Sequence, residues 1–429
     1  MVSVRQPWLA RSLFARTWLT GVAASVLLLG ACGTVDDTVY VPPEQMNAWL
    51  ADKPPSAHHL YATVLTGGQR NRVLNQMRSG LAAFEAGADA IAAASFDDAL
   101  NYIEAIYADN PTAEKARSTF VPERTKEFKG EAYERAMAFL YRGLLFMGEG
   151  DYGNARAVFQ GGQLQDAFAE DQRYQSDFAI LDVLSGWASQ CEGNTVLARD
   201  FYERALQARP GIYIPRPTDR MLAIADIGLP PLKVGGGEYG EYLTFLPPEP
   251  VPEHKAIFVA NGRGYDTTFG EDLYWQASTR GGREVDKILA GKAEFKDIAT
   301  GIGAASLAVA DTALDVAVYA SYSDDSDAAL GIAAGAAIVG IASLLMADAA
   351  RPEADTRYWD NLPAHIDYVS LPAGAMPTEV IFTDQGGSIL GSLVPKVRMD
   401  PKGTCGFAYA RSRLATDIPS DPPNASLRR

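Results

Sequence analysis

The amino-acid sequence predicts an α+β multidomain protein, in which an N-terminal α-solenoid precedes a small antiparallel β-sandwich with an inserted apolar α-hairpin. Three observations support this prediction. Apolar residues recur at helical spacing between residues 70 and 212, with small residues at repeated offsets. Short apolar segments separated by Gly and Pro turns, which are typical of strands, recur in 256–412. A long Ala- and Gly-rich apolar stretch lies within that second half.

Composition excludes several classes of protein. The chain has 429 residues and a net charge of -15, so a nucleic-acid partner is not expected, because phosphate binding needs clustered Lys and Arg. Three cysteines cannot form a disulfide framework, and four scattered histidines provide few ligands for a metal centre. We therefore expect neither a metal nor a cofactor.

Residues 1–31 have the organisation of a secretory signal peptide. Three arginines and no acidic residue accompany an apolar run at 18–29. The apolar run is too short for a comfortable membrane-spanning helix. We therefore predict that the segment directs export and is removed.

The motif Leu-Gly-Ala-Cys, which ends at Cys32, resembles the bacterial lipobox. In lipoproteins, signal peptidase cuts before this cysteine and the thiol is diacylated. Gly33 follows the cysteine, which resembles the outer-membrane address of Gram-negative lipoproteins. The resemblance implies a lipid anchor at Cys32 on the periplasmic face of the outer membrane, with 32–69 as a tether. The alternative is an ordinary signal peptide with a chance cysteine.

Small and aromatic residues recur at fixed offsets in the helical region, 70–212. One register contains Gly186, Gly193, Ala198, Tyr202, Ala205 and Pro210. The same offsets give Gly143, Gly150, Ala155 and Phe159 in a second register, and Gly87, Ala99 and Pro111 in a third. Small residues let two antiparallel helices approach closely, the aromatic ring fills the space between them, and the proline ends the second helix.

These offsets resemble the tetratricopeptide repeat, which implies a tetratricopeptide-like solenoid. The segments 150–152 (Gly-Asp-Tyr) and 193–194 (Gly-Asn) resemble the turn between the two helices of that repeat. The pattern departs from the family, because 43 residues separate Gly143 from Gly186 and the first register lacks its turn glycine. A generic helical bundle with coincidental small residues is the alternative.

Two further motifs extend the resemblance. Residues 128–135 read FKGEAYER, and residues 354–359 read ADTRYW. Together with the lipobox and the repeats, they resemble a poorly characterised family of bacterial tetratricopeptide lipoproteins. Its members are often encoded near lipoproteins similar to the curli secretion channel and to activators of penicillin-binding proteins. The motifs have no assigned chemistry, so the resemblance implies an envelope context rather than a mechanism.

Residues 213–255 contain eight prolines and a glycine triplet at 235–237. Such proline density cannot continue a helix or supply the donors of a central strand, so we predict an extended connector. The triplet lacks the Gly-Lys-Ser/Thr that follows in a phosphate-binding loop. Cys191 and Cys405 lie on either side of this connector. They could pair in an oxidising periplasm, but two separate buried thiols fit two separate domains better.

The region 256–412 is predicted to be rich in β-structure. An apolar segment at 256–260 precedes an Asn-Gly turn, and further strands are expected at 366–371, 379–383, 393–399 and 406–410. Their spacing predicts a small antiparallel sandwich, which resembles PEGA-like β domains that act as spacers or adhesive modules. Residues 413–429 contain three prolines and no aromatic residue, and we predict a disordered tail.

An apolar helical hairpin is predicted at 297–348. The stretch 328–347 has no charged residue, and its length as a helix, about 30 Å, equals the thickness of a bilayer core. Gly331 and Gly335 have the small-xxx-small spacing that permits close helix packing. Three interpretations stay open: a core layer on the β domain, an oligomerisation surface, or a membrane-inserted segment.

A search for catalytic motifs finds no nucleophile elbow and no supported Ser-x-x-Lys. The adjacent His58 and His59 lack a third ligand, so an exposed surface pair is expected. Glu131, Glu134 and Arg135 could form a polar cluster at the start of a helix, but capping and a surface salt bridge explain them equally well. We predict no catalytic residues and no metal site.

These observations together predict a non-catalytic, lipid-anchored periplasmic scaffold. The concave surface of the repeats would hold a segment of another envelope protein, in envelope assembly, secretion or cell-wall synthesis. The family context favours a partner that resembles the curli-type channel or a synthase activator. The alternative is a homo-oligomeric, membrane-associated component assembled through Gly/Ala-rich helical hairpins. A third hypothesis is a hydrolase whose site assembles only in three dimensions.

Overall fold

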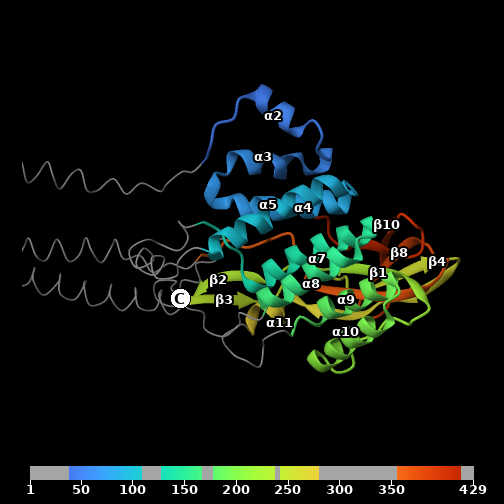
Figure 1. Cartoon of the computed structure of the whole chain (residues 1–429). Helices are drawn as coiled ribbons and strands as arrows, with labels where there is room; N and C mark the ends of the chain where they lie inside the picture. Colours follow the sequence, from blue (N-terminus) through green and yellow to red (C-terminus); the bar gives the residue numbers. More distant parts are fainter. Residues whose placement is uncertain (1–37, 109–126, 167–176, 237–241, 280–354, 417–429) are drawn as a thin grey trace, which may run out of the picture. The chain divides into compact units, whose positions relative to one another are not determined.

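The computed structural model describes residues 38–108, 127–166, 177–236, 242–279 and 355–416. These residues form helices and mixed β-sheets, which confirms the α+β class (Figure 1). Cys32, Pro111 and the hairpin 297–348 with Gly331 and Gly335 lie outside the described residues. Within the described part of the chain, no helix has both the length and the apolar character needed to cross a membrane.

The segment expected to be a tether is folded over its described part, from residue 38. It contains α2 (Pro43–Leu50), a short 3-10 helix at Pro55–Ala57, α3 (His58–Thr66) and a second 3-10 helix at Gln69–Asn71. Leu60 and Tyr61 of α3 are buried in the main hydrophobic core, and the indole of Trp49 donates to the Tyr61 carbonyl oxygen at 2.9 Å. The tether prediction is therefore wrong for these residues, because their apolar side chains pack against α4.

Three helix pairs follow. They are α4 (Arg72–Ala86) with α5 (Asp89–Ala108), α7 (Ala132–Glu149) with α8 (Tyr152–Asp166), and α9 (Ala179–Glu192) with α10 (Thr195–Ala208). Each first helix ends at a glycine with positive φ: Gly87 at 81°, Gly150 at 75° and Gly193 at 90°. Glycine adopts this left-handed conformation without steric cost, so the chain can reverse within two residues.

A five-stranded sheet has the order β10-β11-β1-β7-β6. Its strands are β10 (Lys396–Met399), β11 (Gly406–Arg411), β1 (Asp219–Ile227), β7 (His365–Pro372) and β6 (Thr268–Asp272). The pair β1–β11 is parallel, whereas β1–β7, β6–β7 and β10–β11 are antiparallel. The parallel pair involves β1, which lies outside the region 256–412 that we predicted to form an antiparallel sandwich.

The centre of this sheet comes from the segment that we predicted to be a connector. β1 hydrogen bonds to a strand on each side, and eight of its nine residues are buried. The interval 218–229 contains no proline, and the prolines lie before and after it. Proline density was averaged over all of 213–255, so the proline-free interval was not recognised. In that interval every residue has a backbone N–H, as a central strand requires.

A second sheet has the order β5-β4-β8-β9 and is antiparallel throughout. Its strands are β5 (Arg263–Asp266), β4 (Lys255–Ala260), β8 (Pro377–Thr383) and β9 (Ile389–Leu393). The expected strands at 256–260, 366–371, 379–383 and 406–410 are confirmed as β4, β7, β8 and β11. A separate ribbon pairs β2 (Leu232–Gly236) with β3 (Tyr242–Leu246), and the short helix α11 (Leu273–Ser278) follows β6.

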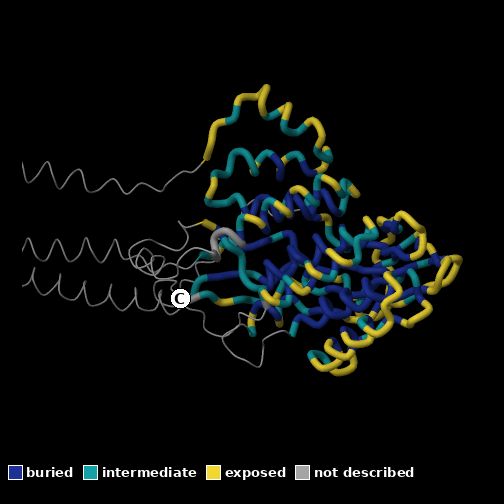
Figure 2. Tube along the Cα trace, in the orientation of Figure 1, coloured by how far each residue is buried: buried dark blue, intermediate teal, exposed yellow. Residues whose placement is uncertain are grey.

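Alternate residues of β1 contribute to two hydrophobic cores. Leu222 and Ile224 belong to the core shared with the helices, whereas Ala223 and Ala225 belong to the core shared with β4 and β8. This alternation follows from the two-residue period of a strand. Figure 2 shows the resulting burial along the strands and the first helices of the pairs. One face of the five-stranded sheet thus contributes to a core shared with the helices, and the other to a core shared with β4 and β8.

The helical and β-rich segments, predicted to be separate domains, share a core. The described residues from Val39 onward belong to one compact unit. A disulfide joins Cys191, at the end of α9, to Cys405, next to β11. The prediction of two separate thiols is therefore wrong, because it assumed that the connector kept the two halves apart.

The start of the tail is also ordered. The Ala415 amide donates to Glu85 Oε2 at 2.7 Å, and its carbonyl oxygen accepts from Asn361 Nδ2 at 2.7 Å. Ala415 itself is fully buried. The predicted disordered tail therefore does not begin at residue 413, and residues 417–429 lie outside the described part.

Candidate functional site

Glycine–aromatic contacts join the helices of each pair. A Cβ on Gly143 would lie 2.3 Å from the ring of Phe159, and a Cβ on Gly186 would lie 2.4 Å from the ring of Tyr202. Such distances leave no room for a methyl group. The alanines of these two registers, Ala155, Ala198 and Ala205, are also buried.

The first pair has a different register from the one predicted. A Cβ on Gly80 would lie 3.2 Å from the ring of Phe96, so Gly80 corresponds to Gly143. Gly87 ends α4 in the left-handed conformation, so it is the turn glycine that we considered missing. Ala99 is fully buried in α5. The predicted register was displaced because Gly87 was assigned to the packing position.

The first helices of the three pairs face the five-stranded sheet. In α9, every residue from Ala179 to Gln190 is buried, and α7 is buried over most of its length. The ring of Phe84 in α4 lies 4.7 Å from that of Tyr409 in β11, and Gln190 of α9 donates to the carbonyl oxygen of Asp219 in β1 at 3.2 Å. One face of these first helices is therefore covered by the chain's own sheet.

A buried ionic network lies at this contact. Asp226 Oδ2 accepts hydrogen bonds from the hydroxyls of Tyr141 and Tyr409, both at 2.6 Å, and Arg411 Nη1 lies 3.2 Å away. The Asp226 and Arg411 side chains are 1% and 2% exposed. Burial raises the pKa of Asp226, while the charge of Arg411 and the two phenol hydrogen bonds oppose that rise. The network ties α7 to β1 and β11.

The polar cluster expected at the start of α7 is buried rather than superficial. The Glu134 side chain accepts from the Trp359 amide at 2.6 Å and from the Glu131 amide at 2.5 Å, and the latter contact belongs to a capping box. Lys233 Nζ lies 2.6 Å from Glu131 Oε1. Burial raises the pKa of Glu134 to about 7, opposed by the charge of Lys233. The capping prediction is confirmed, whereas the surface location is wrong for Glu134.

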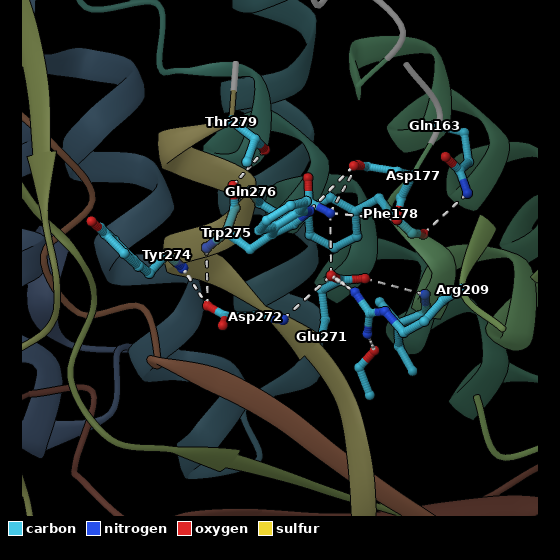
Figure 3. A network of polar contacts seen from close by, with 12 residues as sticks. Gln163, Asp177, Phe178, Arg209, Glu271, Asp272, Tyr274, Trp275, Gln276 and Thr279 are labelled. Carbon is cyan, nitrogen blue, oxygen red and sulfur yellow. Dashed lines mark hydrogen bonds and ion pairs between the residues drawn. The ribbon is translucent and has the colours of Figure 1, made fainter. Parts of the chain in front are cut away.

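A second network, at β6 and α11, surrounds Glu271 (Figure 3). The Glu271 side chain is fully buried and pairs with Arg209, while Gln276 Nε2 donates to Glu271 Oε1 at 3.2 Å. Gln276 also donates to Asp177 Oδ1 at 3.0 Å. Burial raises the pKa of Glu271, and the charge of Arg209 opposes that rise. Three distant segments of the chain therefore meet at one buried carboxylate.

Local backbone geometry places Glu271 inward. The pairing of β6 with β7 shifts register between Phe269 and Glu271. A Cβ on Gly270 would lie 2.8 Å from the Ile366 carbonyl oxygen, so only glycine fits at the position between Phe269 and Glu271. The next residue, Asp272, caps α11 by accepting from the amides of Tyr274 and Trp275 at 2.8 and 3.0 Å. The sequence Gly-Glu-Asp at 270–272 is the signal that sequence reasoning missed.

Two large aromatic side chains project from this network into solvent. Phe269 is 48% exposed and Trp275 is 47% exposed. The guanidinium of Arg209 lies 5.4 Å from the Phe269 ring, and Trp275 Nε1 donates to Asp177 Oδ2 at 3.4 Å. Partly exposed aromatic residues on a fixed frame are the residue types that dominate protein–protein binding energies.

The histidines lie in two groups: His58 and His59 begin α3, whereas His254 and His365 both act on the Asp367 carboxylate. His59 is exposed and His58 is partly buried, with its Nε2 3.1 Å from the Lys53 carbonyl oxygen. His365 begins β7, with its Nε2 3.7 Å from Asp367 Oδ1. In the described ranges, no group of three or more His, Cys, Asp or Glu residues could hold a metal ion.

Comparisons with protein-family models, with curated proteins and with solved structures found no match to this chain. The functional interpretation therefore depends on the contacts and exposed surfaces described above.

Proposed function

We propose that the chain is a non-catalytic scaffold on the periplasmic face of the outer membrane, anchored by lipid at Cys32. It binds another envelope protein in envelope assembly, secretion or cell-wall synthesis. The lipobox-like motif supports the anchor, and the sequence motifs at 128–135 and 354–359 support the envelope context. We also propose that the three helix pairs are a tetratricopeptide-like solenoid and that the two larger sheets form a β-sandwich.

The exposed side chains of Phe269 and Trp275 are the observation that supports this choice of binding surface. The first helices of the pairs are buried against the sheet, so the proposed partner contacts the outside of the molecule. Arg209, which pairs with the buried Glu271, lies 5.4 Å from the Phe269 ring. Asp177 accepts from the Trp275 indole at 3.4 Å and is itself held by Gln276 at 3.0 Å. A partner therefore gains apolar contact area without the cost of ordering two large side chains.

In-cell photocrosslinking tests this function. A benzophenone amino acid at position 275 of the full chain should capture one discrete envelope protein, identified by mass spectrometry. The matched control carries the same group at position 196, because Val196 is 60% exposed on α10 and remote in sequence from the aromatic pair. Equal adducts from both positions, or none from position 275, would overturn the proposed surface.

The anchor is tested separately. A Cys32→Ala variant should lose incorporation of labelled palmitate, while the native chain should incorporate the label and remain in the outer-membrane fraction. Absence of label from the native chain would exclude the lipid anchor, whatever the crosslinking result.

A further inference from the structure

The edge strands of the two larger sheets differ in how they are protected. A free edge exposes unpaired backbone groups, which proteins usually cover or guard with charges. At β6, Arg209 donates to a backbone carbonyl oxygen of the strand, and at β10, Arg398 pairs with Asp89 of α5 at 2.6 Å. At β5, Arg263 and Asp266 place charged side chains on the edge.

β9 has neither kind of protection among the described residues. It lies at the end of its sheet next to β8, and all five of its residues are exposed. Its apolar side chains and the following valine are 71%, 43%, 37% and 75% exposed at Ile389, Leu390, Leu393 and Val394. A register shift opposite Leu390 leaves Gly391–Leu393 as the regular part of this edge.

An apolar cavity of about 270 Å³ adjoins the C-terminal end of β9. Leu393 and Val394 form part of its lining, together with Leu414 and with Ala82 and Ala86 of α4. Leu414 is 54% exposed. We call Ile389, Leu390, Leu393, Val394 and Leu414 the β9 patch. Protruding aliphatic side chains and a hollow that can receive them therefore lie on the same surface.

This arrangement is complementary to itself. A two-fold axis places the same surface of both subunits face to face, so each copy can offer aliphatic side chains to the hollow of the other. The cavity lining also contains one acid, Glu85, and two bases, Lys396 and Arg411. A surface that carries both signs attracts its own copy, whereas a surface of a single sign repels it.

We propose that the β9 patch is the interface of a two-fold homodimer, in which β9 strands of two copies lie antiparallel and join the two four-stranded sheets. Antiparallel pairing of identical edges closes after two copies and leaves no β9 edge free. Pairing of β9 with β5 of another copy would instead continue into open chains, and the charged residues of β5 oppose it. This interface is separate from the Phe269–Trp275 surface.

The first test measures the mass of the full chain, extracted from membranes in mild detergent, by sedimentation at several concentrations. The native chain is expected to dimerise. Val394→Lys should raise the dimer dissociation constant by about tenfold or more, because each dimer would bury two unpaired ammonium groups. Val196→Lys, at another exposed apolar position (60% exposed, in α10), should leave the constant unchanged.

The second test locates the contact in cells. Gly391→Cys or Val394→Cys should give a disulfide-linked dimer on non-reducing gels, whereas Val196→Cys and the native chain should not. A monomeric native chain, a dimer that survives Val394→Lys, or crosslinking from position 196 alone would each overturn the proposal. The proposal would also be overturned if the Val394→Cys variant were monomeric and its thiol did not react with a labelling reagent. That result would show that another part of the same chain covers the β9 patch. None of these results affects capture of a partner from position 275.

Discussion

Replacing Gly143 by alanine introduces a methyl group where the ring of Phe159 already lies. The new Cβ would be 2.3, 2.6 and 2.7 Å from three atoms of that ring. Phe159 is fully buried, so the ring cannot move into solvent to relieve the overlap. The two helices must therefore separate, or the ring must leave its preferred rotamer.

The net effect is a difference between two opposing terms. Alanine favours a helix over glycine by about 1 kcal/mol. Overpacking a buried contact costs about 1–3 kcal/mol, and contact with three ring atoms places Gly143→Ala near the upper end. We expect the free energy of unfolding to fall by about 2 kcal/mol. Gly80→Ala should lower the free energy of unfolding by less, because the new Cβ would lie 3.2 Å from the Phe96 ring.

Urea denaturation followed by circular dichroism measures these changes. The matched control is Gly153→Ala in α8, whose Cβ would meet only Asp151 Oδ1 at 3.8 Å. The free energy of unfolding of Gly153→Ala should rise by about 0.5–1 kcal/mol from helix propensity alone. Adding Phe159→Leu to Gly143→Ala should recover part of the loss in a double-mutant cycle. If Gly143→Ala were as stable as Gly153→Ala, close packing would not explain the glycine.

Two further predictions concern buried groups. Burial raises the folded-state pKa of Glu134 from 4.5 to about 7, so its contribution to stability is complete below pH 4.5 and is lost as the pH rises through 7. The loss amounts to about 3 kcal/mol, and Glu134→Gln should flatten the pH dependence of the urea midpoint between pH 5 and 8; an unchanged slope would refute the assignment. Replacing Cys191 and Cys405 by serine opens a link across 214 residues and should lower stability by about 3–5 kcal/mol. Thiol alkylation of the native chain with and without reductant checks that the bond exists, and two free thiols without reductant would contradict it.

The sequence predicted local features well where a short pattern determines them. The turn glycines at 150 and 193 and the capping box at Glu131 and Glu134 are local, because their geometry depends on fewer than five residues. The strands β4, β7, β8 and β11 were predicted from short apolar segments between Gly and Pro turns. Each of these features is decided by residues that are close in the sequence.

Features that depend on distant residues were missed. The strand β1 was assigned to a connector, because proline density was averaged over a window that included a proline-free interval. Once β1 is placed at the centre of the sheet, the helices and strands share a core and Cys191 can reach Cys405. Asp226 and Arg411 are 185 residues apart, so no local pattern could pair them. One wrong assignment therefore caused several of the later errors.

The candidate binding surfaces also depend on contacts between distant residues rather than on local patterns. The spacing of Gly143, Phe159, Gly186 and Tyr202 predicts close helix pairs, but it contains no information about what covers their other face. Phe269, by contrast, lies beside a register shift between β6 and β7, and its ring is 5.4 Å from the guanidinium of Arg209 in a distant segment. A functional surface of this kind is assembled by tertiary contacts, and sequence reasoning finds only its parts.

The covered face of the helices is unsuited to reversible binding. To release it, the chain would have to separate Asp226 from Tyr141 and Tyr409 and break the bond between Cys191 and Cys405. Breaking a buried ion pair or its hydrogen bonds alone costs about 3–5 kcal/mol, a large part of the stability of an ordinary domain. A partner would have to supply that free energy before gaining any contact of its own. Binding at the outer surfaces requires no such rearrangement, so the buried helices act as a rigid frame on which exposed aromatic and aliphatic side chains are presented.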